Sequence, residues 1–255
     1  MNANPVGPPA DFENTSQSGR VGMLLREKLL RGEFRPGERL AELTLVPLLN
    51  ASRTPVRLAL ERLAHQGLLE ALPNGGFRVR EFTIGDIWDA IEVRGVLEGT
   101  AARLAAERLQ DAKELEGLRA CHGPFTQAPP ADRDNFVHYV EHNLAYHREL
   151  WKLAKSVMLE RALEGVCALP FAEPGALVFG GDEDAQAYHA RNAVIAMEHH
   201  RAILEAIENR EGARAESVAR EHSRMARTNL DWVLRNRHPL DQFPGGALIS
   251  LAAAR

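Results

Sequence analysis

The sequence predicts a mainly α-helical protein: an N-terminal winged helix-turn-helix with a small β-hairpin wing, followed by an all-α helical bundle. Short helical patterns fill the first part of the chain and end in two apolar runs separated by Pro73-Asn74-Gly75-Gly76. An Asn-Gly step between apolar runs is a strong local signal for a β-hairpin. After the hairpin, apolar residues recur at helical spacing, without a strand pattern, to about Arg237.

The spacing of apolar residues in the first part predicts helices over 20–31 and 42–49, a third helix between Ser52 and Gly67, and strands over 68–72 and 77–80. Ser52 is suited to cap the third helix. Pro55 falls in the first turn of that helix, where a missing N–H costs nothing. Gly67 is suited to end it.

The second part predicts helices over 83–109, 112–121, 133–153, 157–169, 186–209 and 213–236. Thr83 and Asp86 stand three residues apart at the start of the first of these helices, which is the spacing of a capping box. We therefore expect four segments: a disordered arm over 1–18, a winged helix-turn-helix domain over 19–82, an all-α domain over 83–237, and a tail over 238–255.

Composition excludes several classes of protein. The 255 residues are 45% hydrophobic and 26% charged, which is ordinary for a soluble globular protein. No apolar run approaches the roughly 20 residues that span a bilayer, and the N-terminal residues do not form a secretory signal. The two cysteines, Cys121 and Cys167, do not make a disulfide framework. We expect a cytoplasmic protein that does not associate with membranes.

The charges are distributed unevenly along the chain. Residues 19–82 hold 11 Lys and Arg against 7 Asp and Glu, whereas the other residues hold 20 against 28. A basic first part joined to an acidic remainder is typical of a nucleic-acid-binding module attached to a part that does not bind nucleic acid.

The start of the third helix carries the residues suited to DNA. Arg53 and Arg57 are four residues apart and share one helix face. An Arg can bond a guanine edge through two hydrogen bonds or clamp a phosphate. Ser52 and Thr54 place hydroxyls at the helix start, where free N–H groups also suit phosphate, and Gly75 lets the wing approach a groove. The alternative is that the two arginines only solvate an amphipathic helix.

The segment FRPGERLAELTLVPLLNASRTPVRLALERLAHQGLLEALPNGGFRV resembles the DNA-binding domain of the GntR family of bacterial transcription regulators. The motifs PG-x-x-L, SRTPVR-x-AL-x-RL and GL carry the resemblance. It implies that Arg53, Thr54 and Arg57 contact a double-stranded operator, with Gly75 and the wing nearby. In some members an Arg of the second helix also contacts DNA, and Leu43 stands at that position here.

Histidines of the second part fall on inward helix faces. His147 lies on the apolar stripe of its helix, with Asn143 one turn earlier. His200 precedes Glu211 by 11 residues and His222 follows it by 11, so in antiparallel helices both lie about 16 Å from the turn. Three imidazoles and one side-chain oxygen suit a divalent transition ion such as Zn, Ni, Mn or Fe. The alternative is that these are core histidines with hydrogen-bond partners.

The segments EVRGVLEGTAARLAA, NLAYHREL, EHHRAILEAI and REHSRMA resemble the FCD effector domain that follows the winged helix in the FadR-type branch of the family. Many members bind a metal through Asp or Asn and three His, which the resemblance places at Asn143, His147, His200 and His222. Where the member has Asp, Asn143 supplies a neutral amide oxygen, which lowers the expected metal affinity.

Arg94 is the candidate effector-binding residue. It lies on a mostly apolar helix stripe, and an Arg that faces inward needs an anionic partner. One partner is Glu98, one turn along the same helix. The other is a carboxylate effector gripped through two hydrogen bonds and completing the metal's coordination, which is the role of a matching Arg in relatives.

We therefore expect a DNA-binding transcription regulator, acting as a repressor and not as an enzyme, whose small carboxylate effector binds beside a divalent metal. We expect a homodimer, because one winged helix reads few bases and two-fold operators mirror two-fold proteins. Two alternatives stay open: a metal-free regulator that responds to a larger ligand such as an acyl-CoA, and a metal-dependent enzyme fused to a DNA-binding module.

Overall fold

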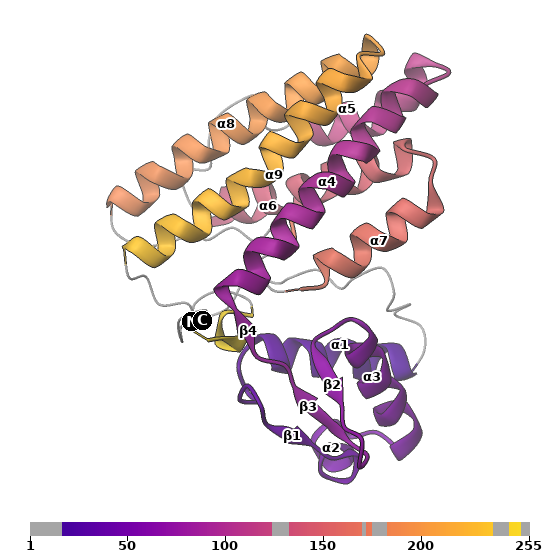
Figure 1. The fold of residues 1–255 in the computed structure, drawn as a ribbon, viewed down its shortest axis with the longest axis vertical. Helices are drawn as coiled ribbons and strands as arrows, with labels where there is room; N and C mark the ends of the chain where they lie inside the picture. The colour runs from indigo at the N-terminus through magenta and orange to yellow at the C-terminus, as the bar shows by residue number, and fades with distance from the viewer. Residues whose placement is uncertain (1–16, 124–132, 170–171, 175–182, 237–244, 251–255) are drawn as a thin grey trace. The chain divides into compact units, whose positions relative to one another are not determined.

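The computed structural model describes residues 17–123, 133–169, 172–174, 183–236 and 245–250 (Figure 1). The predicted arm, apart from Gln17 and Ser18, and much of the predicted tail lie outside these ranges. Contacts divide the chain into two units, one comprising 1–89, 167–173 and 237–255 and the other 90–166 and 174–236.

The first unit contains the helices α1 (Gln17–Leu30), α2 (Glu42–Leu48) and α3 (Arg53–His65). These confirm the helices that the sequence predicts, although α1 begins three residues before the expected start at Arg20. Both α1 and α2 pack on α3. The core between them consists of fully buried aliphatic side chains, among them Leu25, Leu29, Val56, Leu60 and Leu63.

The hairpin is confirmed, with strands β2 (Leu69–Ala71) and β3 (Phe77–Val79). A third strand, β1 (Arg39–Leu40), pairs with the other edge of β3 and gives the order β1-β3-β2. Strand β1 was not predicted, because two residues are too few to show the alternation that marks a strand.

A second, two-stranded sheet was not predicted from the sequence. Strand β4 (Phe82–Thr83) pairs in parallel with β5 (Ile249–Ser250), which lies within the predicted tail. The short 3-10 helix η4 (Gly246–Leu248) precedes β5, and the backbone N–H of Gly245 donates to the carbonyl of Leu30 at 2.9 Å. This pairing depends on contacts between distant parts of the chain, which periodicity does not reveal.

The first unit also holds residues 167–173, which the sequence analysis assigned to the all-α domain. Arg26 of α1 is 6% exposed, and its two terminal guanidinium nitrogens each donate to the carbonyl of Ala168 at 3.2 Å. Burial lowers the pKa of Arg26, and the nearby charge of Glu173 opposes that shift. A buried Arg therefore fixes this segment on α1.

The second unit is helical. Its elements are α4 (Ile84–Arg108, which begins in the first unit), η1 (Ala112–Leu115), α5 (Glu116–His122), α6 (Arg133–Leu153), α7 (Val157–Cys167), α8 (Glu183–Glu208) and α9 (Gly212–Arg235). They match the predicted helices closely, except that the one expected over 112–121 is divided into η1 and α5. Helices α8 and α9 run side by side, and α5 packs on both α6 and α8 (Figure 1). Within the described ranges no helix is both long and apolar enough to cross a bilayer.

Two glycines allow α4 and α9 to approach closely. A Cβ added at Gly99 would lie 2.6 Å from Cγ of Arg220, and one added at Gly95 would lie 3.2 Å from Cβ of Ser223. A side chain at either position would have to displace atoms of α9. The close packing brings Glu98, between the two glycines, within hydrogen-bond distance of α9.

The predicted capping box at the start of α4 is present. The Thr83 backbone N–H and hydroxyl donate to Asp86 Oδ2 at 2.8 and 2.6 Å, and the Asp86 N–H donates back to the Thr83 hydroxyl at 3.1 Å. The hydrogen bonds from the Thr83 side chain and backbone hold the pKa of Asp86 below its ordinary value. The cap is therefore strongest when Asp86 is ionised.

We expect Asp86→Ala to lower the melting temperature at pH 7, because the variant loses the cap of α4. The pKa of Asp86 is lower in the folded than in the unfolded protein. Its contribution is therefore complete above the unfolded pKa of about 3.9 and is lost as the pH falls through the folded pKa. Thermal melts followed by circular dichroism from pH 7 to pH 2.5 should show the two proteins converging at the acidic end.

Asp89→Ala is the matched control, because Asp89 is exposed on the same helix and its replacement removes the same negative charge. It should melt close to wild type across the range. A melting difference for Asp86→Ala that stays constant with pH would refute the ionised cap.

Candidate functional site

The start of α3 presents the predicted DNA-reading residues to solvent. Ser52, Arg53, Thr54 and Arg57 are all exposed, whereas the opposite face of α3 is buried. Ser52 occupies the N-cap position as predicted, with extended backbone, but its hydroxyl makes no capping hydrogen bond. The α3 start therefore combines exposed hydroxyls and guanidiniums with a rigid apolar support.

Each arginine of this surface is paired with a carboxylate. Arg53 Nε lies 2.7 Å from Glu42 Oε2 of α2, and Arg57 Nε lies 3.7 Å from Glu61 Oε1, one turn along α3. The two arginine side chains remain 71% and 56% exposed. Exposed ion pairs of this kind contribute little free energy, so both guanidiniums can exchange a carboxylate for a phosphate or a base.

The wing turns through two glycines in the left-handed region, Gly75 at φ 81° and Gly76 at φ 84°. The space around the Gly75 Cα is open. Arg39 of β1, which the sequence analysis did not single out, donates to the Gly75 carbonyl at 2.9 Å and so supports the wing tip. Leu43, at the position where some family members carry an Arg, is 70% exposed.

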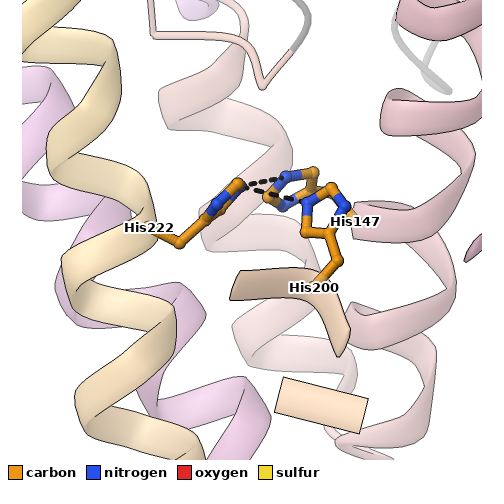
Figure 2. A group of neighbouring side chains, drawn as sticks. All are labelled: His147, His200 and His222. Carbon is orange, nitrogen blue, oxygen red and sulfur yellow. Dashed lines mark hydrogen bonds between the residues drawn. The ribbon is translucent and has the colours of Figure 1, made fainter. Parts of the chain in front are cut away.

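Three predicted metal ligands converge inside the second unit (Figure 2). His147 comes from α6, His200 from α8 and His222 from α9, and they are 2%, 1% and 8% exposed. The Nε2 atom of His222 lies 3.1 Å from Nε2 of His147 and 3.2 Å from Nε2 of His200. The candidate ligand atoms all lie within 4.8 Å of one another.

An aromatic residue positions His200. Tyr146, next to His147 on α6, stacks on the His200 ring with centroids 4.0 Å apart and donates its hydroxyl to the His200 carbonyl at 2.7 Å. Tyr146 is fully buried. Tyr146 was not predicted from the sequence, because an aromatic residue next to an inward-facing histidine has the same pattern as an ordinary core residue.

Asn143, the fourth predicted ligand, is 2% exposed. Its side-chain nitrogen donates to the carbonyl of Pro174 at 2.7 Å. An ionised Asp at this position could not make that bond, because a carboxylate has no N–H to donate. The amide nitrogen of Asn143 is therefore occupied, and the amide oxygen is the atom that would act as a ligand.

Glu98 of α4 is the second important residue that the sequence analysis did not assign to the metal centre. Its side chain is 1% exposed and accepts hydrogen bonds from other helices: from His147 Nδ1 at 2.7 Å, Trp151 Nε1 at 3.2 Å and the Ser223 hydroxyl at 2.7 Å. Its only sequence signal was the i, i+4 spacing to Arg94 on an inward-facing stripe.

Arg94 is 3% exposed, as its place on that stripe predicts. Its Nε lies 3.6 Å from Glu98 Oε2, and its Nη2 donates to the Ser223 carbonyl at 3.4 Å. The pairing with Glu98 that the sequence left as an alternative is therefore present. A guanidinium has five N–H donors, so this pairing is compatible with an effector contact as well.

The electrostatics favour neutral imidazoles at His200 and His222 and an ionised carboxylate at Glu98. Burial, and then the neighbouring His147, lower the pKa of His222 well below its ordinary value, and burial does the same for His200. Burial by itself would raise the pKa of Glu98, but its interactions with His147 and Arg94 and the hydrogen bonds from His147 and Ser223 outweigh burial and hold that pKa well below its usual range.

The donor set suits a divalent transition ion. Neutral imidazole is the form that ligates metals, and three nitrogens converge on one point. His200 Nδ1 and His222 Nδ1 are buried and have no hydrogen-bond partner among the described residues. A metal at the Nε2 atoms would replace the hydrogen bonds between them and place the hydrogen of both rings on these Nδ1 atoms.

Family models cover most of the chain. Residues 17–79 match the model described as bacterial regulatory proteins, gntR family, and residues 89–225 match the model of the FCD domain. The second match alone spans more than half of the chain.

Curated relatives include two regulators. The Nta operon transcriptional regulator of Aminobacter aminovorans is 35% identical over 130 residues, which are 49% of this chain and 61% of the relative. The probable D-xylose utilization operon transcriptional repressor of Paenarthrobacter nicotinovorans is 31% identical over 149 residues, 58% of this chain and 64% of the relative. The chain thus spans slightly less than two thirds of these relatives.

Among solved structures, E. coli McbR/YncC superposes with a TM-score of 0.57 and 22% sequence identity, over 88% of this chain and 100% of that chain. At this level of identity the likeness shows a shared fold.

Proposed function

The chain belongs to the GntR family of bacterial regulatory proteins and carries an FCD domain, and from this premise we propose that it is a DNA-binding transcription repressor, not an enzyme. A small carboxylate effector, bound beside a divalent metal, would control it. The observation that carries the proposal is the convergence of three buried imidazoles in a chain whose α3 presents exposed arginines.

DNA reading is assigned to α3 and the wing. Arg53 and Arg57 would contact base edges or phosphates, and Ser52 and Thr54 would contact phosphate at the helix start. Gly75 would bring the wing backbone close to a groove. The relative from Paenarthrobacter nicotinovorans is named a probable repressor, which supports repression as the sign of regulation here.

The metal would be held by His147, His200 and His222, with the amide oxygen of Asn143 as a fourth ligand. When bound, a divalent ion supplies open coordination positions for an anionic group. The ligand atoms named here carry no formal charge, so the ion's positive charge would remain available to attract an effector carboxylate.

Arg94 would grip the effector. It lies against the same carboxylate, Glu98, that bonds the metal ligand His147, so an anion that reaches Arg94 would lie near the metal. A bidentate Arg–carboxylate contact adds both free energy and geometric specificity.

The regulator would act as a homodimer on a two-fold operator. Val93 and Val96 of α4 are 48% and 42% exposed and offer apolar surface that a second copy would cover. The effector would favour the arrangement of the two copies whose α3 helices no longer match the spacing of the half-sites.

We expect Arg57→Ala to weaken operator binding by about tenfold or more, because one base or phosphate contact is worth ~1–3 kcal/mol. The measurement is a gel shift on a duplex selected by the wild-type protein from random-sequence DNA. Arg31→Ala, which removes an exposed charge after the end of α1, is the control and should bind as wild type. Wild-type affinity of Arg57→Ala would reject α3 as the reading helix.

We expect His222→Ala to lose bound metal and the rise in melting temperature that metal produces, because one of three converging nitrogens is gone. Untagged protein is loaded with Zn, Ni, Mn or Fe, dialysed, and analysed by plasma mass spectrometry and thermal melts. His138→Ala, an exposed histidine on α6, should keep both properties.

Equal metal content in His222→Ala and wild type would reject this ligand set. Wild-type protein that takes up no metal would instead favour the metal-free regulator of a larger ligand.

We expect Arg94→Gln to lose the response to effector while keeping DNA binding. Wild-type protein is screened by thermal shift against small mono- and dicarboxylates, with and without divalent ions. A carboxylate that stabilises wild type should leave the melting temperature of Arg94→Gln nearly unchanged. Arg103→Gln, at a partly exposed arginine of α4 that pairs with Glu107 and Glu216, is the control. An undiminished shift in Arg94→Gln would remove Arg94 from the effector site.

A further inference from the structure

Metal binding by a neutral histidine depends on its tautomer. A neutral imidazole carries one N–H and one lone pair, and only the nitrogen with the lone pair can ligate a metal. The three histidines of the cluster face one another through their Nε2 atoms. Each ring must therefore carry its hydrogen on Nδ1 before a metal can bind.

Of the three rings, His147 has an acceptor at Nδ1 that can fix this state. Glu98 Oε1 lies 2.7 Å from His147 Nδ1 and also accepts from Trp151 Nε1 at 3.2 Å. An indole N–H can only donate, so Oε1 acts as an acceptor in this network. The other carboxylate oxygen, Oε2, accepts from the Ser223 hydroxyl at 2.7 Å.

The same assignment cannot be made for the other two rings. His200 Nδ1 and His222 Nδ1 are buried and have no hydrogen-bond partner among the residues that the structure describes. No acceptor at Nδ1 therefore fixes the tautomer of these two rings. His147 is the ring whose metal-binding state is set in advance.

We propose that Glu98 is the positioning residue of the metal centre: its carboxylate holds His147 with the hydrogen on Nδ1 and the lone pair of Nε2 directed at His200 and His222. This inference rests on the proposed metal site and goes beyond it, because Glu98 is not itself a ligand. Acceptors of this kind orient metal-ligating histidines and are typically worth about 10- to 100-fold in metal affinity.

The Glu98 carboxylate also contacts the proposed effector-binding residue. Arg94 Nε lies 3.6 Å from Oε2 of the same carboxylate. The proposed metal ligand His147 and the proposed effector contact Arg94 therefore share one group. A change at Glu98 should disturb the metal centre even though the three ligand histidines are intact.

The first test measures metal affinity in Glu98→Gln. Glutamine has nearly the same shape, but its amide can either accept from or donate to Nδ1, so the tautomer is no longer fixed. The full-length protein is titrated with Co²⁺ and Zn²⁺ in competition with a chromophoric chelator. We expect affinity to fall by about 10- to 100-fold, with altered visible absorption of bound Co²⁺.

Trp151→Phe is the matched control, because it removes the other donor to Oε1 and leaves the Glu98–His147 bond in place. It should bind Co²⁺ with nearly wild-type affinity even if its melting temperature falls. A purely structural Glu98 would instead lower the melting temperature of the metal-free Glu98→Gln protein and leave its metal affinity unchanged, which would overturn the proposal.

The second test uses the wild-type protein and does not depend on the variant folding. Long-range ¹H–¹⁵N correlation spectra of metal-free protein labelled at histidine report which ring nitrogen carries the hydrogen. We expect Nδ1–H and a bare Nε2 for His147, and the opposite tautomer would overturn the proposal. If wild type shows this tautomer yet takes up no Co²⁺ or Zn²⁺, the proposed metal site is rejected, and with it the role of Glu98 in metal binding. Metal uptake with equal affinity in Glu98→Gln rejects the role of Glu98 alone.

Discussion

A buried carboxylate needs ion pairs and hydrogen bonds to compensate for its lost hydration, and the second unit is organised around one such group. Removing a charge from water costs several kcal/mol unless ion pairs and hydrogen bonds compensate. Glu98 is 1% exposed and is compensated by Arg94 on its own helix, by His147 and Trp151 on α6 and by Ser223 on α9. The helices that supply these partners, α4, α6 and α9, are therefore held in one relative position, which also brings His147 and His222 together.

The balance of charge in this region bears on what it would bind. Arg94 and Glu98 offset one another, and the imidazoles of His200 and His222 are held neutral by burial. With Asn143 in place of an acidic residue, the proposed ligand set adds no negative charge beside the ion. A divalent ion there would keep its full charge, and an anionic effector is the species that would neutralise it.

The fold could be predicted largely from the sequence where structure is local. Helical periodicity gave α6 with its observed ends, Thr83 and Asp86 marked the start of α4, and Asn74-Gly75 marked the wing. The two-residue strands β1, β4 and β5 were not predicted. Such strands are defined by a partner elsewhere in the chain, since two residues have no periodicity and little intrinsic preference for a strand.

The sequence by itself determined the family, the helix faces on which Arg57, His147, His200 and His222 lie, and their burial or exposure, because these follow from spacing along single helices. The tertiary structure decided which neighbours those residues meet. Glu98 reaches Ser223 because Gly95 and Gly99 let α4 approach α9, His147 of α6 meets the same carboxylate, and Tyr146 lies on the ring of His200. Contacts between helices depend on packing in three dimensions, and a one-dimensional pattern shows the face of a residue but not its partner.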